Sequence, residues 1–248
     1  MLSSVAKMFF AVYAIIIVAL SHLVIIPTYF FVFIFLPKKS MAVNAHKVSR
    51  FWAWLLFTFF FIRTEIKGKE LIKPDQAYIF VSNHSSQLDI PIFARACTNT
   101  FRFLSKIEVT RIPLMGYIVK RIYITVDRKD RGDRVKSVEK MKSSLLDEGV
   151  SVVLFPEGTR NRSEKPLLDF KDGAFRLAIE AQLPIAVLTI LNTREYLPAN
   201  KFEMKPGIVR AVWSEPIETK GLTLEDTPIL KEKVKKLLLM NMNNNKSN

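Results

Sequence analysis

The 248-residue sequence has one cysteine, Cys97, and only three histidines, His22, His46 and His84. A single cysteine excludes a disulfide-stabilised scaffold and a zinc site built on thiolates. Three scattered histidines argue against a histidine metal cluster. The sequence also lacks GxGxxG and GxxxxGKS/T, the usual nucleotide-binding motifs. We therefore expect neither a bound metal nor a cofactor.

Acidic residues are absent from residues 1–63, which have six basic side chains and a net charge of +6. Residues 64–248 have the charge content of a soluble domain and a net charge of +8. We therefore expect two parts, membrane-anchoring helices in residues 1–63 and an α/β domain in residues 64–248. The excess of basic residues suits a phosphate-bearing partner, an acidic protein or anionic lipid headgroups. A basic surface that only maintains solubility would explain this excess equally well.

Two apolar segments lie within residues 1–63. Residues 8–36 are apolar apart from Ser21, His22 and Thr28, and as a helix they would measure about 43 Å, more than the bilayer's hydrocarbon thickness of about 30 Å. They are too long for a signal-peptide core, and no small-residue cleavage site follows them. A basic loop is expected at residues 37–50. The second segment, residues 51–62, would measure about 18 Å and cannot span a membrane.

If residues 51–62 do not cross, the basic loop and the following domain share one side, and the positive-inside rule favours the cytoplasmic side. We predict a two-helix monotopic anchor on the inner membrane or another cytoplasm-facing membrane, with residues 51–62 beside the headgroups. A spanning helix at residues 8–36 is the alternative, and core helices of a soluble domain are a third. The predicted membrane contacts are Phe51, Trp52, Trp54, Phe57, Phe60, Lys38 and Lys39.

Short apolar runs alternate with helical segments after residue 64. Strands are predicted at 78–83, 101–106, 122–126, 150–155, 184–191 and 208–213, and helices at 87–96, 134–148, 174–182 and 227–242. The runs VSVVLF and PIAVLTIL are nearly continuous in apolar residues, as in strands buried on both faces. This alternation predicts a layered α/β domain with a largely parallel or mixed sheet flanked by helices.

The motif NHSSQLD follows the first of these strands and contains His84, the only histidine of the α/β domain. On one continuous helix, His84 and Asp89 would point about 140° apart. If the helix begins near Gln87, the chain can fold back so that Asp89 accepts a hydrogen bond from the imidazole. The other ring nitrogen would then act as a general base. A purely structural alternative is a capping box formed by Ser86 and Asp89.

The motif FPEGTRNR follows the strand at 150–155. Glu157, Gly158, Thr159 and Arg160 offer a carboxylate, a permissive backbone, a hydroxyl and a guanidinium suited to phosphate. A polar turn with a surface salt bridge is the favoured explanation of the string in isolation. Two more cations lie at strand ends, Lys106 and Arg128, and the carboxyl ends of parallel strands are where sites form in α/β sheets.

Three ordered blocks resemble the glycerolipid acyltransferase family, most closely its 1-acylglycerol-3-phosphate acyltransferases. The first family block, NHxxxxD, is matched by Asn83, His84 and Asp89, and the third, FPEGTR, by residues 155–160 without a change. The second resembles residues 105–128, with Lys106, Glu108, Pro113, Gly116 and Arg128 at the expected spacings. The fourth block departs from the family, because Val187 stands where a second proline would follow Pro184. That departure puts the shape of the acyl pocket in doubt.

The resemblance covers about residues 80–190. It implies transfer of a fatty acyl group from a thioester on acyl carrier protein or coenzyme A to the 2-hydroxyl of lysophosphatidate, which makes phosphatidate at the surface of membrane lipids. It implies that His84 removes the hydroxyl proton and that Asp89 orients His84. The acceptor's phosphate and glycerol would be bound by Lys106, Arg128, Glu157, Gly158, Thr159 and Arg160.

Other functions remain open at this point. Within the family, the acceptor could be glycerol 3-phosphate or another lysophospholipid. A non-catalytic basic module that binds membranes would explain the apolar segments and the charge, but not the histidine and aspartate at a strand end. Nucleic acid is not an expected partner, since no reading helix or aromatic RNA-binding pattern accompanies the basic residues.

Overall fold

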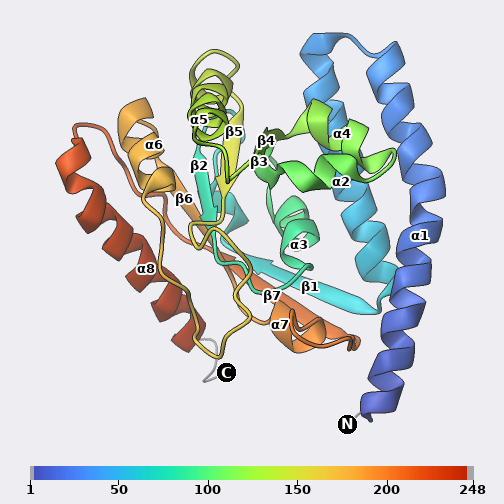
Figure 1. Cartoon of the computed structure of the whole chain (residues 1–248). Helices are drawn as coiled ribbons and strands as arrows, with labels where there is room; N and C mark the ends of the chain where they lie inside the picture. The colour runs from blue at the N-terminus through green and yellow to red at the C-terminus, as the bar shows by residue number, and fades with distance from the viewer. Residues whose placement is uncertain (1–2, 245–248) are drawn as a thin grey trace.

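A mixed sheet of seven strands forms the centre of the fold, in the order β1-β7-β6-β2-β5-β3-β4 (Figure 1). The structure is a computed structural model that describes residues 3–244, without the side chains of Lys38 and Lys39, so the membrane contacts predicted for these two residues lie outside it. Neighbouring strands are parallel except β6 and β7, which are antiparallel. The strands are β1 (Ile62–Lys67), β2 (Ile79–Ser82), β3 (Phe101–Lys106), β4 (Ile124–Val126), β5 (Ser151–Leu154), β6 (Ile185–Ile190) and β7 (Gly207–Trp213).

Side chains of the central strands alternate between two apolar layers, one on each face of the sheet. Phe80 of β2 packs with α2 (Lys38–Phe59) and α3 (Asp89–Ala96). Its neighbours Ile79 and Val81 pack with α5 (Arg131–Leu146), α6 (Gly173–Ala181) and α8 (Thr227–Asn244) on the other face. Strands β2, β5 and β6 are buried along their whole lengths. Helices on both faces explain why these strands are continuously apolar, and the predicted α/β class is confirmed.

The six predicted strands and the four helices predicted for the α/β domain are present, but three elements were missed. Strand β1 pairs only with β7 at the edge of the sheet and includes Arg63, Glu65 and Lys67, so it has no apolar run to reveal it. Helices α4 (Met115–Ile122) and α7 (Thr193–Tyr196) are too short to show a helical period. Three 3-10 turns complete the described chain, η1 (Lys69–Leu71), η2 (Ile107–Arg111) and η3 (Leu224–Asp226).

Two helices precede the sheet, α1 (Ser4–Phe35) and α2 (Lys38–Phe59). The prediction of a basic loop at residues 37–50 is wrong, because α2 begins at Lys38. Ala45 and Val48 pack against α1 and α4, and this inward apolar face stabilises the helix despite the basic residues beside it. Among the described residues, α1 is the one helix long and apolar enough to cross a membrane.

Helix α1 contacts the α/β domain near both of its ends. Near its start, the backbone N–H of Met204 donates to the carbonyl of Lys7 at 3.2 Å. Near its other end, the ring of Phe30 stacks on Tyr117 of α4 with the ring centres 5.1 Å apart. Helix α1 therefore lies along the side of the domain, with α2 between it and the sheet (Figure 1).

The five aromatic side chains predicted to contact the membrane differ in their burial. Phe51 and Trp54 are exposed on α2. Phe57 and Phe60 are each 3% exposed and pack in the core beside the sheet, so their placement differs from the prediction. Trp52 is half-buried, because it lies between α1 and α2. The helical period explains the division, since residues three apart share the face that turns inward.

Candidate active site

The carboxyl ends of five strands meet at one edge of the sheet, because β2, β3, β4, β5 and β6 run parallel to one another. His84 follows β2, Lys106 ends β3, Arg128 follows β4, and residues 157–160 follow β5. The topology therefore brings the predicted segments to the edge at which open α/β sheets bind their ligands.

His84 and Asp89 are in direct contact at this edge. The imidazole Nδ1 lies 2.8 Å from Oδ2 of Asp89, which is the first residue of α3. Because an ionised carboxylate only accepts hydrogen bonds, Nδ1 carries the proton and Nε2 presents a lone pair. The His84 side chain is 16% exposed, whereas Asp89 is completely buried. The ring therefore has a fixed orientation and a partly open side, the arrangement that a general base needs.

Asp89 also organises the chain that leads into α3. Its Oδ2 accepts the backbone N–H groups of Ser85 and Ser86 at 2.6 and 2.8 Å. The capping box of Ser86 and Asp89 forms only in part, because Asp89 accepts the N–H of Ser86 but α3 begins after Leu88 without a side-chain cap. The other oxygen, Oδ1, accepts a hydrogen bond from the hydroxyl of Thr193 at 2.6 Å. Thr193 was not predicted from the sequence, since it lies 104 residues from Asp89 and belongs to no motif.

Glu157 contacts the loop that contains His84. Its Oε1 accepts the backbone N–H of His84 and its Oε2 that of Leu168, both at 2.8 Å. The side chain is 3% exposed. Burial raises the pKa of the Glu157 carboxyl, while the two N–H donors oppose the rise. Both oxygens are bonded to backbone, so in this structure Glu157 holds the loop and does not face a glycerol pocket.

Further contacts immobilise His84. The amide of Asn83 exchanges two hydrogen bonds of 2.8 Å with the backbone of Ile190, which joins the ends of β2 and β6. The carbonyl of His84 accepts the N–H of Asn161 at 2.7 Å. The imidazole stacks on Phe155, with ring centres 4.3 Å apart. The loop after β5 therefore contacts both the backbone and the imidazole ring of His84.

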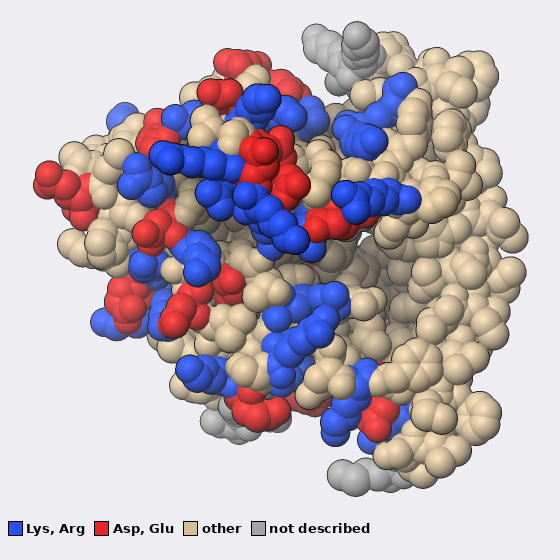
Figure 2. Space-filling model, in the orientation of Figure 1, with Lys and Arg blue, Asp and Glu red and all other residues tan. Residues whose placement is uncertain are grey.

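The predicted cations differ in their surroundings. Arg128 donates from Nη1 to the carbonyl of Gly158 and so ties the end of β4 to the loop after β5. Gly158 has a φ of 71°, a conformation that favours glycine. Lys106 is paired with Glu108 at 2.7 Å and is more than half exposed. Figure 2 shows many Lys and Arg side chains over the α/β domain and few charged side chains on the α1 side.

Arg160 and Thr159 are the site residues with unused polar groups. Thr159 is exposed and Arg160 half-buried, and neither side chain has a hydrogen bond or ion pair to the residues that the structure describes. The backbone of the same loop is fixed, because Asn161 and Glu157 on either side are both bonded to His84. A guanidinium on a fixed loop near an imidazole can bind an anionic group of a molecule that reacts at the imidazole.

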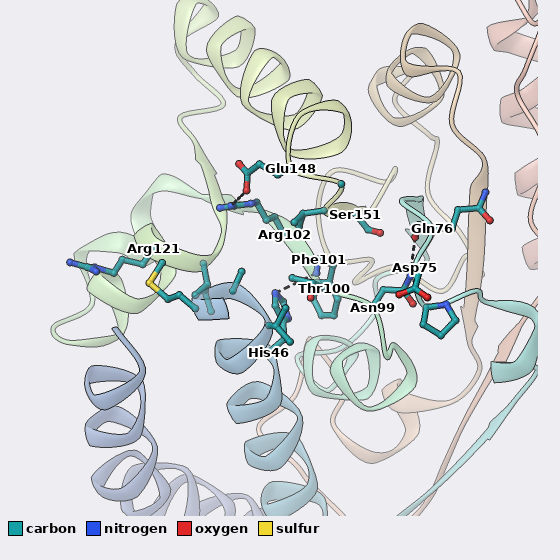
Figure 3. A pocket seen from close by; sticks show the side chains of 17 residues that line it. His46, Asp75, Gln76, Asn99, Thr100, Phe101, Arg102, Arg121, Glu148 and Ser151 are labelled. Carbon is teal, nitrogen blue, oxygen red and sulfur yellow. Dashed lines mark hydrogen bonds and ion pairs between the residues drawn. The ribbon is translucent and has the colours of Figure 1, made fainter. Parts of the chain in front are cut away.

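A cavity of about 520 Å³ lies at the other edge of the sheet. Its lining includes Phe101 and Ser151, the first residues of β3 and β5, together with His46 of α2 (Figure 3). Burial lowers the pKa of His46 to about 3, and the charge of Arg50 adds to the effect. The cavity contains none of the residues predicted for the site. Within residues 3–244, no three His, Cys, Asp or Glu side chains are grouped so that they could hold a metal ion.

In comparisons with known proteins, residues 63–191 match a family model described as Acyltransferase. The human protein 1-acyl-sn-glycerol-3-phosphate acyltransferase alpha is 32% identical over 181 residues, which are 72% of this chain and 63% of that protein. A chloroplastic 1-acyl-sn-glycerol-3-phosphate acyltransferase of Brassica napus is 30% identical over 175 residues, 69% of this chain and 50% of that protein. The chain thus spans half to two thirds of these relatives.

A crystal structure shares the fold over nearly the whole chain. The 1-acyl-sn-glycerophosphate (LPA) acyltransferase PlsC from Thermotoga maritima superimposes with a TM-score of 0.82 and covers 98% of both chains, at 24% sequence identity. At this identity the likeness concerns the fold. The matched length includes both N-terminal helices as well as the sheet.

Proposed function

The chain belongs to the acyltransferase family, and from this premise we propose that it transfers a fatty acyl group from an acyl thioester to the 2-hydroxyl of lysophosphatidate. The product is phosphatidate. The observation that supports this proposal most directly is the 2.8 Å contact between His84 Nδ1 and Asp89 Oδ2, at the ligand-binding edge of the sheet. The names of the relatives support lysophosphatidate as the acceptor.

His84 acts as the general base. Its Nε2 takes the proton of the acceptor's 2-hydroxyl while that oxygen attacks the thioester carbonyl. The tetrahedral intermediate then collapses, the carbon–sulfur bond breaks, and the imidazolium returns the proton to the departing thiolate. No protein nucleophile is required, because the thiolate is already a good leaving group. Positioned proton transfer of this kind contributes about 10²–10⁴ in rate, and Asp89 stabilises the imidazolium while it exists.

Arg160 binds the phosphate of the acceptor, with Gly158 and Thr159 beside it. The guanidinium offers forked donors that match a phosphate and has no competing ion pair among residues 3–244. Arg128 supports the loop from one side, and Lys106 adds positive charge near the same edge. Because residues 157 and 161 are bonded to His84, the backbone that carries Arg160 is held beside the base. That arrangement supplies proximity, which contributes strongly to two-substrate reactions.

Helices α1 and α2 anchor the protein in one leaflet. The contacts of α1 with the domain at Lys7 and Phe30 are separated by about 35 Å of helix, more than the hydrocarbon thickness of about 30 Å. A spanning α1 would place these two domain contacts on opposite sides of the bilayer. Along its outer face α1 exposes Phe9, Leu23 and Phe31, which supply apolar area for shallow insertion. We place the catalytic domain on the cytoplasmic side, where acyl carrier protein and coenzyme A thioesters occur.

An acceptor and donor screen tests this function. The purified protein is given lysophosphatidate, glycerol 3-phosphate or lysophosphatidylcholine, each with acyl carrier protein and coenzyme A thioesters. We expect turnover with lysophosphatidate to exceed the others by at least about tenfold. A preference for glycerol 3-phosphate would contradict the assigned acceptor. Full turnover by His84→Ala would contradict general-base catalysis, and no turnover with any pair would favour a non-catalytic membrane-binding module.

A further inference from the structure

Thr193 donates a hydrogen bond to Asp89 of the catalytic pair from the segment that follows β6. Its hydroxyl lies 2.6 Å from Oδ1 of Asp89, and both side chains are buried, at 1% and 0% exposure. We propose that Thr193 is a positioning residue that fixes the Asp89 carboxylate and, through it, the imidazole of His84. This inference rests on the general-base function proposed above.

The four donors to Asp89 are distributed unequally between its oxygens. Oδ2 accepts from His84, Ser85 and Ser86, whereas Oδ1 accepts from Thr193 alone among the residues described. The three hydrogen bonds to Oδ2 fix the position of that one oxygen. They leave the carboxylate free to turn, because rotation about the Cβ–Cγ bond of aspartate has only a low barrier. The bond from Thr193 fixes the second point. It therefore sets the plane of the carboxylate that faces the imidazole.

Thr193 is itself held on a rigid support. It follows β6, whose last residue Ile190 exchanges two hydrogen bonds with Asn83, immediately before His84. Just beyond Thr193, the carbonyl of Leu197 accepts a hydrogen bond from Ser86 Oγ at 2.7 Å. The segment after β6 is thus tied to the histidine loop on both sides of Thr193. A donor held in this way can preorganise the group that it contacts.

The hydroxyl is not occupied by local structure. Thr193 is the first residue of α7, where hydroxyl side chains commonly bond to their own helix start, but its hydroxyl donates to Asp89 instead. Without the hydroxyl, a buried carboxylate oxygen would lose its donor. Asp89 would then turn toward other donors and draw Oδ2 away from His84.

The test compares Thr193→Val, which removes the hydroxyl but keeps the shape, with Thr193→Ser, which keeps the hydroxyl. Thr219→Val is the matched control, because Thr219 is also completely buried and its hydroxyl donates to Leu183 at 2.8 Å, near the amino end of β6. We expect kcat of Thr193→Val to fall about tenfold or more, as for loss of a bond to a charged group. KM for both substrates should change less than about threefold, Thr193→Ser should restore kcat, and Thr219→Val should keep it.

Thr193→Val in a His84→Ala background distinguishes a role that acts through His84 from a merely structural role. If Thr193 acts through His84, then Thr193→Val should cause no further loss of the residual rate. An equal loss in that background, or a loss that Thr219→Val reproduces, would show a merely structural role and overturn the inference. Wild-type kcat in Thr193→Val, with His84→Ala inactive, would overturn the inference and leave the proposed function standing. Wild-type kcat in His84→Ala would overturn general-base catalysis by His84, on which this inference rests.

Discussion

Replacing Glu157 with glutamine tests whether this residue holds the histidine loop or binds the acceptor. In the structure its two carboxylate oxygens accept the N–H groups of His84 and Leu168, each at 2.8 Å. The glutamine side chain has one oxygen and one NH₂ group, so it can satisfy only one of these donors. The other backbone N–H would face a second donor in a site that is 3% exposed.

The expected effect on stability follows from that unpaired group. A buried donor without an acceptor costs about 1–3 kcal/mol. For a chain of this size, each kcal/mol lowers Tm by about 2–4 °C. We therefore expect Glu157→Gln to melt about 2–12 °C below the wild type. We also expect kcat to fall, because the backbone of His84 loses an anchor, while KM for lysophosphatidate changes less than about threefold.

The assay combines thermal unfolding in detergent with steady-state kinetics on mixed micelles. Glu180→Gln is the control, because Glu180 lies on the surface of α6 in ion pairs with Lys142 and Arg176, and exposed pairs contribute little. Its Tm and kcat should stay close to wild type. An unchanged Tm of Glu157→Gln, together with a KM for lysophosphatidate raised more than tenfold, would show that Glu157 contacts the acceptor and would refute its assignment as a loop-holding residue.

Three further predictions follow from the same geometry. Arg160→Ala should raise KM for lysophosphatidate at least about tenfold and KM for the acyl thioester much less, since the lost group binds phosphate; equal effects would contradict the assignment. Replacing Leu23 and Phe31 together by aspartate should release the protein from vesicles in a flotation assay and leave Tm unchanged, because both side chains are exposed on α1. Because burial raises the pKa of the Glu157 carboxyl above its ordinary value of 4.5, its protonation favours the folded state over the unfolded state. This contribution to stability is fully present below pH 4.5 and is lost as pH rises through the raised pKa. The Tm difference between wild type and Glu157→Gln should therefore narrow as pH rises through that range, and a widening difference would contradict it.

The parts of the fold that the sequence predicts are those set by local patterns. Continuous apolar runs identify β5 and β6, because strands covered on both faces need apolar side chains at every position. The contact between His84 and Asp89 is predictable because only five residues separate them and the intervening turn has a helix-start signal. Their placement with Arg160 follows from the parallel sheet, in which each segment comes after a strand.

The missed features depend on contacts between distant segments. Strand β1 is held by pairing with β7, about 145 residues later, so no local pattern reveals it. The first half of α2 is helical because Ala45 packs against α1 and α4, although its basic residues suggest a loop. The orientation of Glu157 depends on Leu168, and the role inferred for Thr193 depends on Asp89. Contacts between distant segments determine each of these four features, so no local sequence pattern predicts them.

The proposed reaction depends on the imidazole of His84, which is oriented by Asp89 and removes the proton from the acceptor hydroxyl. The most direct measurement is kcat of His84→Ala with lysophosphatidate and an acyl thioester, in protein whose Tm and vesicle binding match the wild type. We expect kcat to fall by at least about 10². A kcat within about threefold of wild type would contradict it.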